Sequence, residues 1–203
     1  PLPVITASST EGLNTVDRRV DGDRSTTWRS EGAGVQSLTL DLGYEREFGG
    51  LTLRWAERLA ATRYRISASA EGREWRELAL VEKANGGVDW VRLPETSGQW
   101  LRLDLLAPEP APAVVGQVGA GQRLNAAAES AYGLSELEIE PLAFGETATT
   151  FASAVAKEAR RGLYPRGFHG EQPYWTLVGV DGGGESGLIG EDGAVELRRG
   201  GPS

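Results

Sequence analysis

The stretch Ser37-Leu38-Thr39-Leu40-Asp41-Leu42 alternates polar and apolar residues without a break. Successive side chains of a β-strand point to opposite faces, so this pattern predicts a strand with one apolar face and one polar face. Strands of this kind are typical of antiparallel sheets that pack face to face and keep their other faces in solvent. The stretch therefore favours a β-sandwich.

Further segments repeat the alternation on either side of this stretch. They cover residues 51–55, 64–68, 75–81, 88–93, 101–105 and 136–140. Turn-forming residues separate them, including Glu71-Gly72 and Asn85-Gly86-Gly87. We therefore expect a mainly β protein with an antiparallel jelly-roll β-sandwich. The tryptophans expected to pack in its core are Trp28, Trp55, Trp75 and Trp90, and Trp100 could pack or be exposed.

The alternation stops in two places. Residues 107–131 are rich in Pro and Gly, which predicts a long loop inserted before the last strand. After residue 142 we expect a helix over 151–161, capped by Thr150, and then two or three short strands. Those elements are too few for an independent core. We therefore assign 1–142 to the sandwich and 143–203 to the opening of a second, incomplete domain, or to a segment docked on the sandwich.

Composition excludes several classes of function. The 203 residues carry a net charge of −8, which argues against binding to nucleic-acid phosphates or to anionic lipid by charge. No apolar run is long enough for a transmembrane segment, and there is no Cys for a disulfide or a thiolate metal site. The single His, His169, stands in no metal-ligand or nucleophile motif, so we expect no catalytic activity.

An acidic turn near the N-terminus is a candidate cation site. Asp21, Asp23 and Thr26 flank Gly22 and offer the hard oxygen ligands that Ca²⁺ prefers. The turn is not an EF-hand, because the sixth position from Asp21 holds Thr26 instead of Gly and the twelfth holds Gly32 instead of Glu. From these residues alone, an acidic turn without an ion is an equal alternative.

Taken in order, the segments resemble a discoidin domain, the coagulation factor 5/8 type C family, whose bacterial members include family 32 carbohydrate-binding modules. The pieces that carry the resemblance are Ala7-Ser8-Ser9, Val20 to Trp28, Leu38 to Gly43, Tyr64 to Trp75, Trp100 to Leu103 and Tyr132 to Ile139. Each piece is a weak motif, but all of them occur in the family's order. The resemblance implies an eight-stranded, galactose-binding-domain-like jelly roll. Residues 164–176 resemble, more loosely, the opening of a β-rich domain of bacterial glycan-active proteins.

The resemblance also implies a structural Ca²⁺ site that joins the first long loop to the last strand. Its expected ligands are the side chains of Asp21, Asp23, Thr26 and Glu136 and backbone carbonyls near Arg18 and Ser135. Animal members often join the two ends of the domain by a disulfide, which this chain cannot form, and that favours a bacterial module. The family's Trp-Glu pair appears here as Trp55-Ala56-Glu57, shifted by one residue, which leaves the loop after Trp55 uncertain.

In sugar-binding members of the family the ligand lies on loops at one end of the sandwich. The positions that match, or that the loop order places there, are Glu11, Arg29, Glu57, Arg58 and Tyr132. Charged side chains would hydrogen-bond sugar hydroxyls, and an aromatic ring would stack on the apolar face of the sugar. Ordinary solvated charge is the alternative for Arg29, Glu57 and Arg58, and packing beneath the 107–131 loop is the alternative for Tyr132.

These expectations converge on a non-catalytic carbohydrate-binding module with a structural calcium ion and a glycan as its partner. We expect a secreted, periplasmic or cell-surface bacterial protein, tethered to further domains of a larger glycan-degrading chain. A protein- or membrane-adhesion discoidin module is one alternative, although the loops show no apolar spikes. A purely structural spacer or assembly domain is the other.

Overall fold

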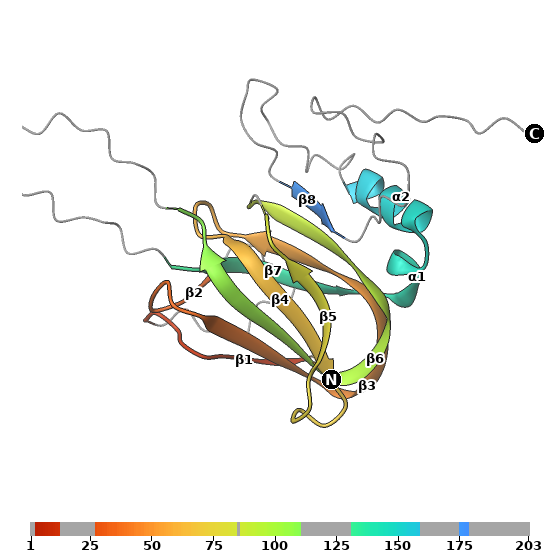
Figure 1. Cartoon of the computed structure of the whole chain (residues 1–203), viewed down its shortest axis with the longest axis horizontal. Helices are drawn as coiled ribbons and strands as arrows, with labels where there is room; N and C mark the ends of the chain where they lie inside the picture. The colour runs from red at the N-terminus through yellow and green to blue at the C-terminus, as the bar shows by residue number, and fades with distance from the viewer. Residues whose placement is uncertain (1–2, 13–26, 85, 111–130, 159–174, 179–203) are drawn as a thin grey trace, which may run out of the picture.

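The computed structural model describes residues 3–12, 27–84, 86–110, 131–158 and, by backbone alone, 175–178. Its elements run along the chain as β1 Val4–Ala7, β2 Trp28–Arg29, β3 Gln36–Trp55, β4 Ala61–Ser69, β5 Arg76–Val81, β6 Val88–Pro108, β7 Gly133–Glu140, α1 Leu142–Gly145, α2 Ala148–Glu158 and β8 Trp175–Val178. The protein is therefore mainly β, as the alternation predicts (Figure 1).

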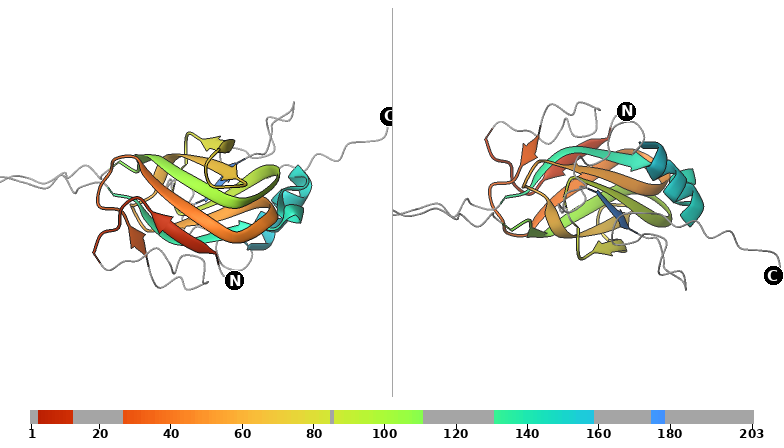
Figure 2. Two further views of the ribbon diagram at one scale, coloured as in Figure 1. Left: turned by 90° about the horizontal axis from the view of Figure 1, so that it is seen from below. Right: turned by 90° about the horizontal axis from the view of Figure 1, so that it is seen from above.

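Two long, bent strands build the sandwich. β3 and β6 pair antiparallel from Gln36↔Leu105 to Arg54↔Val88, with irregular register between Asp41 and Arg46. Such irregularities bend a strand, so each long strand contributes to both layers of the sandwich (Figure 2). The first half of β3 pairs with β1 and its second half with β7, while β6 also pairs with β4, giving the order β2-β7-β3-β6-β4-β5.

The core lies where the alternation places it. Leu38, Leu40 and Leu42 are completely buried, whereas Thr39 and Asp41 between them are half-buried. Leu38 is opposite Leu103 across the β3–β6 pair, so the apolar faces of the two strands coincide. The predicted antiparallel sandwich is confirmed. Among the tryptophans expected inside, Trp75 is only half-buried, because it precedes β5 instead of belonging to it.

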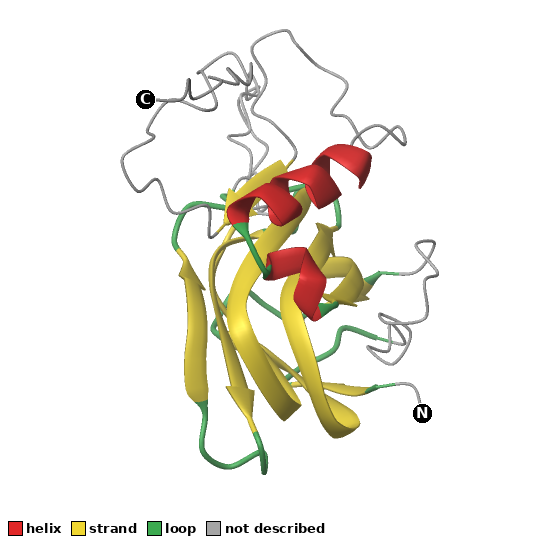
Figure 3. Ribbon diagram, turned by 90° about the vertical axis from the view of Figure 1, so that its right-hand side faces the viewer, coloured by secondary structure: helices red, strands yellow, loops and turns green. Residues whose placement is uncertain are grey.

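The two helices pack against the sandwich. Phe144 of α1 and Phe151 of α2 meet edge to face with ring centroids 5.2 Å apart, and they bury Trp90 together with Val155. A Cβ on Gly49 would collide with the backbone of α1, so that glycine lets the helix approach β3 (Figure 3). The described part of the chain after residue 142 is thus docked on the sandwich.

The start of the second helix differs from the prediction. α2 begins at Ala148, and Thr147, not Thr150, caps it: Thr147 Oγ1 accepts the backbone N–H of Thr150 at 3.0 Å. Thr150 Oγ1 in turn accepts the backbone N–H of Thr147 at 2.9 Å, a reciprocal arrangement. Sequence alone cannot decide which of these two threonines caps the helix, because they are three residues apart and each is a good capping residue. β8 adds parallel to β6, and the rest of the assigned second domain lies outside the described residues.

Candidate functional site

Three segments that are distant in sequence meet at Gly133, the first residue of β7. Arg29 of β2 pairs with Gly133 on one side. On the other side the Gly133 N–H donates to the Leu59 carbonyl at 2.7 Å, and the Gly133 carbonyl accepts the Ala56 N–H at 2.9 Å. A Cβ at Gly133 would lie 2.8 Å from Leu59 Cβ, closer than real contacts allow. The missing side chain thus permits the loop 56–60 to approach β2 and β7.

Arg29 and Glu11 form a pair at this end of the sandwich. Arg29 Nε lies 2.8 Å from Glu11 Oε2, and the two side chains are 40% and 51% exposed. Within the described part of the chain, Arg29 Nε is nevertheless not aligned for a hydrogen bond, so the contact is mainly one of charge. Neighbouring hydrogen bonds hold the two segments together. The Glu11 backbone N–H donates to the Arg29 carbonyl at 2.8 Å, and the Trp28 side chain donates from Nε1 to the Ser9 carbonyl at 3.1 Å.

Glu57 and Arg58 are exposed on the neighbouring loop. Arg58 has a φ of 61°, the left-handed conformation that costs a residue with a side chain about 1 kcal/mol or more. Bonds on both sides maintain it, from Leu59 N–H to the Ala56 carbonyl at 3.1 Å and from Trp55 N–H to the Gly87 carbonyl at 2.8 Å. The structure therefore brings Glu11, Arg29 and the Glu57-Arg58 loop together at one end of the sandwich, and their role in sugar binding stays a prediction.

A buried carboxylate anchors this loop from below. Asp89 is completely buried, and its Oδ2 accepts hydrogen bonds from Trp55 Nε1 at 2.8 Å and from the Tyr64 hydroxyl at 2.9 Å. Burial, followed by the negative charge of Asp89, raises the pKa of Tyr64 well above its ordinary value. Sequence reasoning missed Asp89. The available signal is an acid between Val88 and Trp90, inside an otherwise apolar strand.

Tyr132 does not present its ring to solvent. It is completely buried, its N–H donates to Ser30 Oγ at 2.9 Å, and its hydroxyl donates to the Ala33 carbonyl at 3.4 Å. Burial raises the pKa of Tyr132. The expectation of an aromatic platform for sugar at this position is therefore corrected: the alternation of β7 does not extend to Tyr132, and the structure favours its packing role.

Only one side of the predicted calcium site falls within the described residues. Arg18, Asp21, Asp23 and Thr26 lie outside them, as does His169. Glu136 on β7 is 1% exposed, and its neighbour Ser135 has its hydroxyl 3.2 Å from that of Thr27, which follows Thr26 in sequence. In the ranges that the structure describes, no three His, Asp or Glu side chains converge on a metal position. The calcium ion stays a prediction.

The fold is a jelly-roll sandwich, and Glu11, Arg29 and the loop 56–60 lie together at one end of it. The sequence profile of the F5/8 type C domain matches residues 4–116, more than half of the chain. The chain therefore belongs to the F5/8 type C, or discoidin, family, as the sequence analysis expects. No curated protein sequence matches the chain.

Several solved structures that are similar to this chain are carbohydrate-binding modules. One is chitosan-binding module 2, in complex with chitotriose, of a chitosanase/glucanase from Paenibacillus sp. IK-5, at 22% identity and a TM-score of 0.54 over 68% of this chain and 95% of that one. Another is CpGH89CBM32-5 from Clostridium perfringens, in complex with GalNAc-β-1,3-galactose, at 19% identity and a TM-score of 0.53 over 68% and 94%. The domain thus has a carbohydrate-binding-module-like, non-catalytic fold. None of its described helices could span a membrane.

Proposed function

We propose that this chain binds a glycan at the loop end of the sandwich. The observation that carries the proposal is the meeting of β2, β7 and the loop 56–60 at Gly133, which places Arg29 and Arg58 on adjacent backbone segments. The fold supports it, because two structures similar to this chain are carbohydrate-binding modules in complex with chitotriose and with GalNAc-β-1,3-galactose.

The chemistry of the loop end suits sugar hydroxyls. A guanidinium donates parallel N–H bonds, which match two neighbouring hydroxyls, and a carboxylate accepts from them. Arg29 and Glu11 already stand 2.8 Å apart, so one donor and one acceptor are placed before a ligand arrives. Half-buried Leu59 lies against Gly133, the strand partner of Arg29, and would offer an apolar contact that Tyr132 does not supply. A shallow site of this kind binds weakly alone and gains from tethering.

The proposal includes a structural calcium ion. Its ligands would be the side chains of Asp21, Asp23, Thr26 and Glu136 and the carbonyls of Arg18 and Ser135. Support comes from the described side of the site. Glu136 is a buried carboxylate on β7, and a carboxylate oxygen is a hard ligand of the kind that Ca²⁺ takes. Ser135 beside it contacts Thr27, at the end of the predicted loop. The ion would act on folding and not on the sugar directly.

The setting we propose is an exported bacterial protein in which this module is tethered to a glycan-degrading enzyme. Membership of the F5/8 type C family supports this setting, and so does the similarity to a module of a chitosanase/glucanase. The full-length gene product would test it, since a neighbouring domain with a glycosidase fold is expected. A full-length chain without an export signal or any glycan-active domain would contradict it.

A glycan array followed by titration tests the binding itself. We expect at least one glycan to be retained, and we expect Arg29→Ala and Arg58→Ala each to weaken its binding. Arg65→Ala is the matched control, because Arg65 is 42% exposed, pairs with Glu77 and lies on β4 away from the loop end. Binding to anionic liposomes or to a protein partner, with no response to any glycan, would replace this function with the adhesion alternative.

A further inference from the structure

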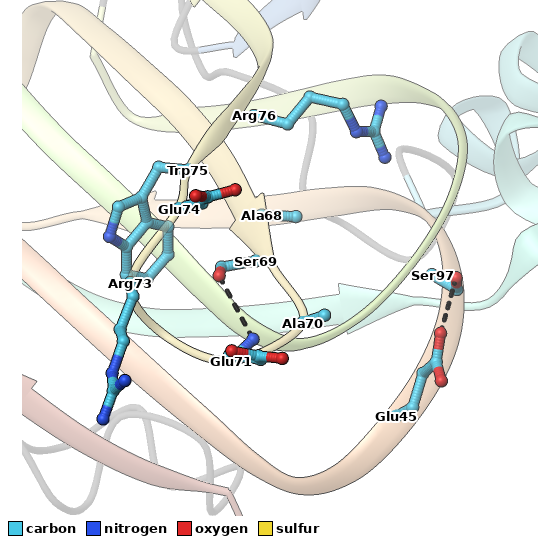
Figure 4. Close-up of a pocket in the computed structure, with 10 residues that line it drawn as sticks. All are labelled: Glu45, Ala68, Ser69, Ala70, Glu71, Arg73, Glu74, Trp75, Arg76 and Ser97. Carbon is cyan, nitrogen blue, oxygen red and sulfur yellow. Dashed lines mark hydrogen bonds between the residues drawn. The ribbon is translucent and has the colours of Figure 1, made fainter.

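A second recess lies at the other end of the sandwich, away from Gly133. β4 runs from Ala61 at the loop end to Ser69, where the turn 70–75 and the bends of β3 and β6 border an open recess of about 830 Å³. Figure 4 shows Trp75 and Glu74 on one side, Glu45 and Ser97 on the other, and Glu71 in the turn below. None of the residues predicted to bind sugar lines this cavity.

Hydrogen bonds and packing hold its walls in place. Ser69 Oγ accepts the backbone N–H groups of Glu71 at 3.3 Å and of Gly72 at 2.9 Å. Gly72 has a φ of +74° and lies flat on the Trp100 ring, since a Cβ there would be 3.1 Å from the indole. Across the cavity, Ser97 Oγ donates to Glu45 Oε1 at 2.9 Å (Figure 4). A recess fixed in this way loses little conformational entropy when a ligand enters.

Two hollows share the Glu45–Ser97 pair, and each of them has an aromatic side chain in its lining. Trp75 lines the cavity and is half-buried, and its ring centre lies 5.6 Å from the Arg102 guanidinium carbon, which helps to orient it. Beyond the pair, a second hollow of about 640 Å³ shares Glu45 and Ser97 with the first and is lined by Tyr44, which is 50% exposed. The two hollows adjoin at Glu45 and Ser97, and we refer to them together as the groove, with one aromatic side chain in the lining of each half.

Apart from Ala68 and Ala70, the remaining lining residues are polar or charged. Among the described residues, the side chains of Glu71, Arg73, Glu74 and Arg76 take part in no ion pair. The first hollow holds three carboxylates and two guanidinium groups, so its balance is slightly acidic. Aromatic rings beside hydrogen-bonding charges suit a sugar, which has apolar faces and a polar rim. The acidic balance disfavours uronic or sulfated sugars.

We propose that this groove, from Trp75 through Glu45 and Ser97 to Tyr44, is a second saccharide site that takes neutral or amino-sugar oligosaccharides of at least two units. The inference goes beyond the proposed function, whose site lies at the loop end. It makes the module bivalent, with one shallow site at the loop end and one preorganised groove at the opposite end. Two sites on one domain would raise retention on a polymeric glycan more than either site alone.

Two-dimensional NMR of the isotope-labelled full chain, titrated with chitotriose, cellotriose and trigalacturonate, tests the groove. We expect chitotriose or cellotriose to shift the Trp75 indole signal and the amide signals of residues 44–47 and 69–76. Trp75→Ala should lower the affinity measured from the Tyr44 signals about tenfold, as expected from losing one stacked ring. Trp75→Phe should restore most of that affinity. Arg29→Ala, in the loop-end site, should leave the groove signals unchanged.

The outcomes separate the two sites. The second site is overturned if the groove signals do not shift, or if they shift equally in wild type and Trp75→Ala. It is also overturned if only trigalacturonate shifts them. If loop-end signals move and groove signals do not, the proposed function stands without this inference. If groove signals move and loop-end signals do not, the groove stands and the loop-end site fails. A normal amide spectrum of Trp75→Ala shows that the variant is folded.

Discussion

At the scale of single residues, Asp89 holds Trp55 and Tyr64 beneath the candidate site. Its buried Oδ2 accepts a hydrogen bond from each of them. Asp89→Asn removes the charge that these donors face, and hydrogen bonds to a charged group contribute about 1.5–3 kcal/mol each. We expect the free energy of unfolding in urea to fall by roughly 2–3 kcal/mol.

The matched control is Glu82→Gln, which removes a charge from an exposed pair with Arg63 at 3.8 Å. Exposed pairs of this kind contribute about 0–1 kcal/mol, so the control should unfold nearly as wild type does. If Asp89→Asn were as stable as Glu82→Gln, Asp89 would not anchor the loop.

Tyr64 makes the free energy of unfolding depend on pH in the alkaline range. Burial first, and then the charge of Asp89, raise the pKa of Tyr64 in the folded protein well above its ordinary value. The unfolded chain therefore loses the phenolic proton first, near pH 10, and folded stability falls as the pH rises above that value. Below about pH 10, Tyr64 is neutral in both the folded and the unfolded state, so it does not make the stability depend on pH.

Thermal unfolding of wild type and Tyr64→Phe across pH 8 to 11 checks this expectation. Tyr64→Phe should unfold more easily at pH 8, because Asp89 loses a donor, and should then lose stability less steeply than wild type above about pH 10. Equal slopes above pH 10 in both proteins would contradict the assignment.

At the scale of elements, Gly133 sets the distance between β7 and the loop 56–60. In Gly133→Ala the new Cβ would lie 2.8 Å from Leu59 Cβ and 3.0 Å from Ala56 Cβ, so the loop must move. We expect a loss of about 1–3 kcal/mol in stability and weaker glycan binding, because Arg58 moves with the loop. Gly34→Ala is the control, since nothing lies within 4 Å of its Cβ. Unchanged affinity in Gly133→Ala would show that the loop does not contribute to the site.

The strands could be predicted because their signal is local. Leu38, Leu40 and Leu42 mark one face by spacing alone, and that face is the buried one. The convergence at Gly133 has no such signal, since it depends on a turn geometry at Arg58 and on a glycine that no pattern singles out. Tyr132 shows the same limit, because its exposure is decided by the distant Ser30 and Ala33. Matching the family's order placed Arg29 and Arg58 at one end, but no sequence pattern pointed to the groove beside Trp75.

At the scale of the whole molecule, the predicted calcium ion would join the first loop to the last strand and stabilise the sandwich. Removing it with EDTA should lower the melting temperature by roughly 5–10 °C, the shift expected when a ligand present at about 100 times its Kd is lost. Glu136→Gln should melt near the EDTA value and respond less to EDTA. A wild-type melting curve that EDTA leaves unchanged would contradict the calcium site.

The central claim is that this discoidin domain binds a glycan through the loop end. Isothermal titration of the best array glycan into wild type, into the Arg29→Ala/Arg58→Ala double variant and into Arg65→Ala tests it most directly. We expect wild type and Arg65→Ala to bind alike, with a Kd on the order of micromolar to millimolar, and the double variant to lose at least about tenfold in affinity at the loop-end site. Equal affinity in all three proteins, or no heat of binding in wild type, would contradict the claim.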